Sequence, residues 1–245
     1  MAADSGEEFG KFVLRGVLGK GGMGSVYKAL DRESGETVAL KILPRFLVGD
    51  KDFLDRFMRE ARAIGQLAHP NIVAFKEFGD ISGSYFLSME FVQGLSLPNA
   101  FPRLPVPEET AVRVMRQVAQ AVHYAHTSEQ GVIHRDLKPG NIIITGDTLV
   151  KIIDFGLSKI ASEATLTVTG TQLGTPAYMA PEQFGNSKVV DHRSDIWSIG
   201  VIFYELLAGE RPIPGKKIVQ LVKRINDPDF NIPPLRGLNP SVSGE

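Results

Sequence analysis

The 245-residue sequence contains no cysteine, which excludes disulfide scaffolds, cysteine-based zinc sites and thiol catalysis. An excess of either charge is also missing, because 27 basic and 28 acidic residues leave a formal net charge of −1. Proteins that bind nucleic acid through its phosphates usually carry a basic excess, so we expect no nucleic-acid partner. No apolar run approaches the roughly 20 residues that span a bilayer, and residues 1–10 lack a signal-peptide pattern. We therefore expect no membrane contact within this segment and a cytoplasmic location.

The remaining composition, 43% hydrophobic and 22% charged residues, is typical of a soluble globular protein. Residues 1–8 are polar and predict a flexible tail. Short apolar-rich segments predict strands at 12–18, 24–30, 37–43 and 85–92, with one helix at 52–67. Further along, helices are predicted at 107–126, 195–208 and 217–225, and short strands at 141–144 and 150–153. This distribution predicts an α+β fold with a β-rich lobe over 9–92, a mostly helical lobe over 93–245 and a cleft between them.

A glycine cluster follows the first predicted strand and reads Leu18-Gly19-Lys20-Gly21-Gly22-Met23-Gly24-Ser25-Val26. Gly19, Gly21 and Gly24 fit the pattern G-x-G-x-x-G, in which glycines let backbone N–H groups approach phosphates. A plain hairpin turn would show the same pattern. The segment after Gly24 alternates like a strand, which argues against a dinucleotide-binding helix, and a Walker loop would need Lys-Ser/Thr there. A hairpin that covers a nucleotide is the functional interpretation that remains.

A lysine and a glutamate form the next candidate pair. Lys41 lies in the third predicted strand, where a lysine is usually solvated. Glu60 lies between Phe57 and Ile64 on the apolar face of the helix over 52–67. A buried carboxylate is costly without a cation, so we predict that Lys41 pairs with Glu60. The alternative is a glutamate at the rim that bends out to water.

Three further motifs occur in a fixed order. His134-Arg-Asp-Leu-Lys-Pro-Gly-Asn141 matches H-R-D-L-x-x-x-N, Asp154-Phe-Gly follows a predicted strand, and Ala180-Pro-Glu comes later. Together with the glycine loop and Lys41, these motifs resemble the catalytic domain of a eukaryotic-like serine/threonine protein kinase of the kind also common in bacteria. The resemblance covers residues 9–240 and implies the bilobal kinase fold, whose β-rich lobe carries one regulatory helix.

The resemblance implies a role for each matching residue in phosphoryl transfer from ATP to protein substrates. Asp136 would accept the proton of the substrate hydroxyl, and Lys138 would neutralise charge on the γ-phosphate. Asp154 and Asn141 would hold Mg²⁺, with Mn²⁺ as an alternative, while Lys41 would contact the phosphates. Thr175 would bridge Asp136 and Lys138, as in kinases that act on serine and threonine.

Nucleotide-binding residues follow from the same resemblance. The adenine-site residues would be Val26 and Ala39 above the base, Ile143 below it, Met89 as gatekeeper, and Glu90 and Val92 as the hinge. Arg135 would bind an activation-loop phosphate, and we predict autophosphorylation of Thr167 or Thr169, with Thr171 next. A threonine-rich loop over 157–180 that carries no modification is the alternative.

Two other functions remain open at this point. A pseudokinase or scaffold module is the first, although Lys41, Asp136 and Asp154 are all retained. A small-molecule kinase of the same fold is the second, and the intact segment from Gly174 to Glu182 argues against it. We expect a monomer or weak dimer, and a parent protein that can be membrane-anchored outside this segment.

Some expectations concern single residues and the chain length. Pro107 is predicted as the first residue of its helix, and Asp195 as a helix N-cap or an anchor for the stacked residues His134 and Phe155. His123 and His126 could form a metal-binding pair on one helix face, but no third ligand is apparent. The length of 245 residues is short for the kinase pattern. We therefore expect an incomplete C-lobe without its last helices, no arginine partner for the motif glutamate at 182, and reduced stability relative to a longer form.

Overall fold

The structure is a computed structural model that describes residues 6–21, 24–44, 51–155, 176–184, 190–215 and 217–244. The chain divides into two compact units, with the boundary between Gln93 and Gly94. No helix among these residues is both long and apolar enough to cross a membrane.

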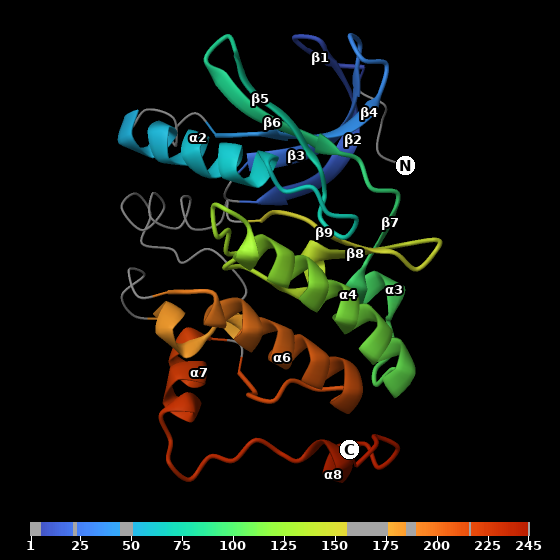
Figure 1. Cartoon of the computed structure of the whole chain (residues 1–245), viewed down its shortest axis with the longest axis vertical. Helices are drawn as coiled ribbons and strands as arrows, with labels where there is room; N and C mark the ends of the chain where they lie inside the picture. The colour runs from blue at the N-terminus through green and yellow to red at the C-terminus, as the bar shows by residue number, and fades with distance from the viewer. Residues whose placement is uncertain are drawn as a thin grey trace. The chain divides into compact units, whose positions relative to one another are not determined.

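The first unit is a six-stranded antiparallel sheet with one helix. Its strands are β1 (Glu8–Phe9), β2 (Phe12–Gly21), β3 (Gly24–Asp31), β4 (Thr37–Ile42), β5 (Phe75–Ile81) and β6 (Ser84–Glu90), in the order β1-β2-β3-β4-β6-β5. The helix α2 (Lys51–Gly65) packs against β5 (Figure 1). The four predicted strands and the predicted helix are confirmed, whereas β1 and β5 were not predicted.

Alternation along the strands sorts the side chains of this sheet. Val38 and Leu40 of β4 point to one face and join a buried cluster with Phe12, Leu14, Ala29 and Phe86. Ala39 and Lys41 alternate with them and therefore point to the opposite face. One face of the sheet thus builds the hydrophobic core, and the other carries Ala39 and Lys41.

The second unit combines helices with a small antiparallel sheet. The helices are α3 (Leu97–Ala100), α4 (Glu108–Thr127), α6 (Arg193–Ala208), α7 (Ile218–Ile225) and α8 (Leu235–Leu238), with 3₁₀ turns η1 (Pro139–Asn141), η2 (Pro176–Tyr178) and η3 (Pro181–Phe184). The sheet pairs β7 (Gly94–Ser96), β8 (Ile142–Thr145) and β9 (Val150–Ile152). Buried residues recur on α4 every three or four positions, from Ala111 to Ala125, and this face meets α6 and β9 (Figure 1).

Several predicted details of the helices are wrong. Pro107 is the N-cap of α4 and not its first residue, because its ψ of 139° is not helical and the helix begins at Glu108. The helix α6 begins at Arg193 with His192 as N-cap, so Asp195 lies inside the helix and is not its N-cap. The predicted end of α6 at residue 208 is confirmed, and Gly209 follows it with a left-handed φ of 84° that glycine adopts at little cost.

The residues that follow α7 contain the short helix α8 and return to the other helices of this unit. The Tyr204 hydroxyl donates to the Pro233 carbonyl at 2.7 Å, and the Asn239 side chain donates to the Leu207 carbonyl at 2.8 Å. Ser243 donates its backbone N–H and its hydroxyl to the Glu108 carboxylate at 2.9 and 2.6 Å. These bonds tie the tail to the end of α6 and the start of α4. The expectation of reduced stability relative to a longer form stays a prediction.

The close approach of β5 and β6 at Gly79 makes a testable prediction. A Cβ atom at this position would lie 2.7 Å from two ring atoms of Phe86, which is 4% exposed and makes edge contacts with Phe9 and Phe12. Because that ring has little room to move, we expect Gly79→Ala to lower the free energy of unfolding by about 1–3 kcal/mol in urea titrations. Gly16→Ala in β2 is the matched control, since among the described residues no atom beyond its chain neighbours lies within 4 Å of its Cβ position. Equal unfolding midpoints for the two variants would contradict the prediction.

Candidate active site

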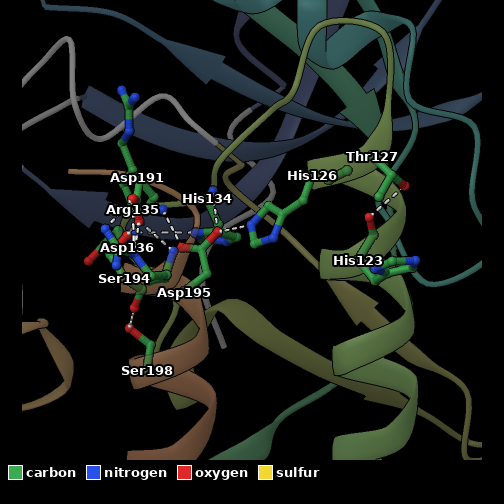
Figure 2. Close-up of polar contacts among 12 residues, drawn as sticks. His123, His126, Thr127, His134, Arg135, Asp136, Asp191, Ser194, Asp195 and Ser198 are labelled. Carbon is green, nitrogen blue, oxygen red and sulfur yellow. Dashed lines mark hydrogen bonds and ion pairs between the residues drawn. The ribbon is translucent and has the colours of Figure 1, made fainter. Parts of the chain in front are cut away.

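A buried carboxylate organises the loop that carries the H-R-D motif. Asp195 of α6 has no exposed side-chain surface and accepts the backbone N–H groups of His134 and Arg135, each at 2.8 Å. Its Oδ2 atom also lies 2.7 Å from Nε2 of His126 on α4. Figure 2 shows His126 pointing from α4 toward Asp195, while His123 points away. The anchoring role predicted for Asp195 is therefore present, and His126 supports it rather than forming half of a metal pair.

The electrostatics of Asp195 follow from these contacts. Burial by itself raises the pKa of its carboxyl group, because the charged form loses water. The hydrogen bonds from His126 and the two backbone N–H groups stabilise the charged form, and together they hold the pKa below its ordinary value. Asp195 is therefore a permanent anion at neutral pH.

The two ring nitrogens of His134 each make a hydrogen bond that holds the loop near Asp136. Its Nε2 atom lies 3.0 Å from the Ile153 carbonyl, which can only accept, so Nε2 carries the proton. The Nδ1 atom is left as an acceptor and takes the backbone N–H of Asp136 at 3.3 Å. The His134 ring also packs on Phe155, with ring centroids 4.6 Å apart.

Asp136 and Lys138 form the polar centre of the loop. The Lys138 ammonium donates to Oδ2 of Asp136 at 2.6 Å, and both side chains are only partly exposed. The Asn141 amide donates to the Asp136 backbone carbonyl at 2.8 Å. Arg135, the residue before Asp136, has a left-handed φ of 65°, a conformation that costs a non-glycine residue about 1–3 kcal/mol. Such strain persists only where neighbouring contacts hold the backbone, as the Asp195 carboxylate does here.

Pairing of β8 with β9 brings Asn141 and Asp154 to the same end of this hairpin. Ile142 lies opposite Ile152, and the Ile153 N–H donates to the Asn141 carbonyl at 3.0 Å. Asp154 follows directly and has a left-handed φ of 59°. Both side chains offer oxygen atoms, and the Asn141 amide nitrogen is already used by the Asp136 carbonyl, so its oxygen faces any further partner.

This donor set fits a hard divalent cation. Mg²⁺ prefers oxygen ligands, and few of them need come from the protein because the ion keeps several waters. Within the ranges that the structure describes, no group of three or more His, Cys, Asp or Glu side chains could hold a metal ion. Asn141 and Asp154 are therefore the residues that suit such an ion when phosphate oxygens complete its shell.

In the first unit, the predicted nucleotide residues gather on the sheet face opposite the core. Val26 of β3 lies opposite Lys41 of β4, and Ala39 lies opposite Met89 of β6. Residues directly opposite each other share a face, so these four side chains form one surface. Lys41 is 5% exposed there. Glu60 is partly buried on α2 between the buried residues Phe57 and Ile64.

The glycine cluster forms the hairpin that joins β2 to β3, with Gly19 opposite Val26, Lys20 opposite Ser25 and Gly21 opposite Gly24. Gly24 needs to be glycine, because its φ is 112° and a Cβ atom would lie 2.0 Å from the Ile42 carbonyl oxygen. Leu18 is half exposed on β2, Glu90 ends β6 before Val92, and Ile143 lies on β8 of the second unit. Other predicted residues lie outside the described part of the chain: Gly22, Met23, Thr167, Thr169, Thr171 and Thr175.

The segment Pro176–Phe184 is fixed to α6 by polar contacts that the sequence did not indicate. The Tyr178 hydroxyl donates to Glu205 at 2.7 Å, and the Ser198 hydroxyl donates to the Tyr178 carbonyl at 2.8 Å. Burial and the bond to Glu205 both raise the pKa of the Tyr178 hydroxyl, so it stays protonated. Glu182 of this segment is near enough to contribute to the raised pKa of Arg193, for which Asp191 is the main cause.

The buried Asp195 anion makes a prediction about stability. An asparagine at this position would keep one acceptor but turn its amide hydrogens toward a backbone donor, so we expect Asp195→Asn to lower the free energy of unfolding by about 3 kcal/mol. The Asp195 pKa is lower in the folded chain than its ordinary value of 3.8, so this stabilisation is present above that pH and is lost as the pH falls through the folded pKa. The difference in unfolding free energy between wild type and variant should therefore shrink below about pH 3.8.

Urea titrations at several pH values measure that difference. Asp229→Asn is the matched control, because Asp229 is exposed. A difference between wild type and Asp195→Asn that is the same at pH 6 and pH 3 would contradict the charge-based account.

Comparison with known proteins agrees with this geometry. A family model described as the protein kinase domain matches residues 12–239. Serine/threonine-protein kinase PknE of Mycobacterium bovis is 37% identical over 222 residues, which cover 90% of this chain and 39% of PknE. PknH of Mycobacterium tuberculosis is 39% identical over 208 residues, which cover 84% of this chain and 33% of PknH. The chain thus spans between about a third and two fifths of the length of these curated relatives.

A solved structure shows the same fold. The PknI kinase domain of Mycobacterium tuberculosis matches with a TM-score of 0.68 and 28% identity, covering 98% of this chain and 85% of that one. The predicted fold class, α+β with a β-rich lobe and a helical lobe, is confirmed. The chain belongs to the protein kinase family, as a serine/threonine kinase domain of the bacterial, eukaryotic-like type.

Proposed function

We propose that the protein containing this domain transfers the γ-phosphate of ATP to serine and threonine hydroxyls of proteins, including its own activation loop. The observation that carries this proposal is the Asp136 carboxylate. It is paired with Lys138 at 2.6 Å, on a loop whose backbone is held by the buried Asp195. Kinase family membership implies ATP and a divalent metal ion, and we propose Mg²⁺ as that ion, with Mn²⁺ as an alternative.

The first unit supplies the binding groups in this proposal. Lys41 on its largely apolar sheet face is a shielded cation, suited to the phosphates, with Glu60 as its proposed partner. Val26, Ala39 and Met89 are the apolar neighbours of Lys41 on that face, and they suit the adenine ring. The hairpin from Gly19 to Gly24 has little side-chain bulk and can bring backbone N–H groups to phosphate oxygens. Leu18, Lys20, Gly22, Met23 and Ser25 belong to the same proposed hairpin, with Glu90 and Val92 as hinge residues and Ile143 as the second unit's contribution.

The second unit supplies the chemistry. The Asp136 carboxylate accepts the proton of the substrate hydroxyl and orients that oxygen for attack. Lys138 places a positive charge beside the same carboxylate, where it can neutralise the negative charge of the transferred group. Asn141 and Asp154 would hold the metal ion, which supplies charge neutralisation on the phosphate oxygens when bound. Thr175 is proposed to bridge Asp136 and Lys138. The proposed location of the protein is the cytoplasm.

A pseudokinase or scaffold would not need these groups, so substitution of Asp136 tests the proposal. We expect Asp136→Asn to lower kcat by about 10²–10⁴-fold with protein substrate and Mg-ATP, because asparagine cannot accept the proton. Asp80→Asn is the control, since this exposed residue lies at the end of the β5 strand. Equal phosphorylation by wild type and Asp136→Asn would favour the scaffold function.

Autophosphorylation is the second part of the proposal. The Nε atom of Arg135 is buried and has no hydrogen-bond partner within the part of the chain that the structure describes, so it suits a phosphate. After incubation with Mg-ATP, mass spectrometry should find phosphate on Thr167 or Thr169, with Thr171 next, and none of it in Asp136→Asn. A loop without phosphate in an enzyme that still phosphorylates substrate would contradict this prediction.

A further inference from the structure

The peptide bond between Arg135 and Asp136 is held on both of its sides. Its N–H belongs to Asp136 and donates to Nδ1 of His134 at 3.3 Å. Its carbonyl belongs to Arg135 and accepts from the side-chain amide of Gln183 at 2.8 Å. A peptide bond is planar, so its rotation changes the direction in which the next Cα–Cβ bond points. These two bonds therefore set the direction of the Asp136 side chain.

Gln183 is itself fixed in orientation. Its Oε1 atom accepts the backbone N–H of Ala180 at 2.8 Å, while its Nε2 atom donates to Arg135. An amide offers one acceptor and one donor group. If this amide were flipped, its NH₂ group would face the Ala180 N–H and its oxygen would face the Arg135 carbonyl, so neither hydrogen bond could form. The side chain is partly buried in η3, so its one favourable orientation spans the two chain segments.

The segment that carries Gln183 and the H-R-D loop that it contacts are both bonded to the helix α6. The segment Pro176–Phe184 is held on α6 by the bonds that Tyr178 makes with Glu205 and Ser198. The same helix carries Asp195, which holds the N–H groups of His134 and Arg135. The Arg135 N–H thus donates a hydrogen bond to Asp195, and the Arg135 carbonyl accepts one from Gln183. Both partners are part of α6 or are fixed to it.

We infer that Gln183 is a positioning residue, which aims the Asp136 carboxylate by holding the peptide bond before it. The inference rests on the proposed function, in which Asp136 accepts the substrate proton. Arg135 has a left-handed φ of 65°, so its backbone returns toward common conformations once a constraint is removed. Without the Gln183 bond, Asp195 still anchors the loop, but the carbonyl loses its donor and the Asp136 side chain samples further directions. The kinetic cost falls on kcat, because nucleotide binding depends on other residues.

Two substitutions separate the two hydrogen bonds of Gln183. Gln183→Met keeps the length of the side chain and removes both bonds. Gln183→Glu keeps an acceptor for the Ala180 N–H but turns a second oxygen toward the Arg135 carbonyl. Gln120→Met and Gln120→Glu are the matched controls, because Gln120 is exposed on α4.

We expect both Gln183 variants to lower kcat about tenfold, as the loss of one hydrogen bond in the transition state would do, with KM for ATP within about twofold of wild type. The kcat values are expressed per folded molecule, from titration with a non-hydrolysable ATP analogue, so that a loss of folded protein does not imitate the effect. Wild-type kcat in Gln183→Glu would overturn the inference, because the bond to Arg135 would then be dispensable. A rise in KM at unchanged kcat would also overturn it.

Asp136→Asn measured in parallel separates this inference from the proposed function. If Asp136→Asn keeps the wild-type kcat, the proposed role of Asp136 fails and the inference fails with it. If Asp136→Asn is inactive while Gln183→Met keeps the wild-type kcat, only the inference fails.

Discussion

The second unit is organised around a negative charge that has no access to water. The Asp195 carboxylate would be strongly unfavourable in this position without hydrogen-bond donors. Two consecutive backbone N–H groups of the H-R-D loop and the ring of His126 provide them. Since these donors come from α4 and from the loop, and the acceptor from α6, one anion joins three separate parts of the chain. The geometry of Asp136, Lys138 and Asn141 depends on that junction.

Single hydrogen bonds connect this junction to the other residues of the candidate site. His134 is held by Asp195 at its backbone and by the Ile153 carbonyl at its ring, which leaves Nδ1 to hold the Asp136 N–H. Ile153 in turn pairs with Asn141, and Asp154 follows it. The two residues of this region with left-handed φ, Arg135 and Asp154, flank the chain of contacts. Backbone strain of this kind is common where side chains must point in directions that relaxed strands and turns do not provide.

Local patterns predicted most of the secondary structure, and their failures have physical causes. The strands β2, β3, β4 and β6 are short segments rich in apolar and aromatic residues, so the sequence predicts them as strands, and in β4 alternation also assigns the two faces. β5 was missed because Gly79 and three charged residues weaken its pattern, and only its pairing with β6 makes it a strand. The start of α6 was misplaced because its first turn, Arg193 to Asp195, is polar, and Asp195 looked like a cap. A helix boundary depends on contacts beyond the helix.

The family, the identity of the motif residues and most of the longer strands and helices followed from the sequence, because motif spacing and local residue patterns are properties of neighbouring residues. Tertiary structure alone decided which of those residues meet. His126 and Asp195 are 69 positions apart, and Gln183 and Arg135 are 48 apart. No local pattern marks such pairs, since a histidine or a glutamine on a helix or turn has many possible partners. The partner becomes definite only when packing of α4, α6 and the loop removes the alternatives and leaves one donor facing one buried acceptor.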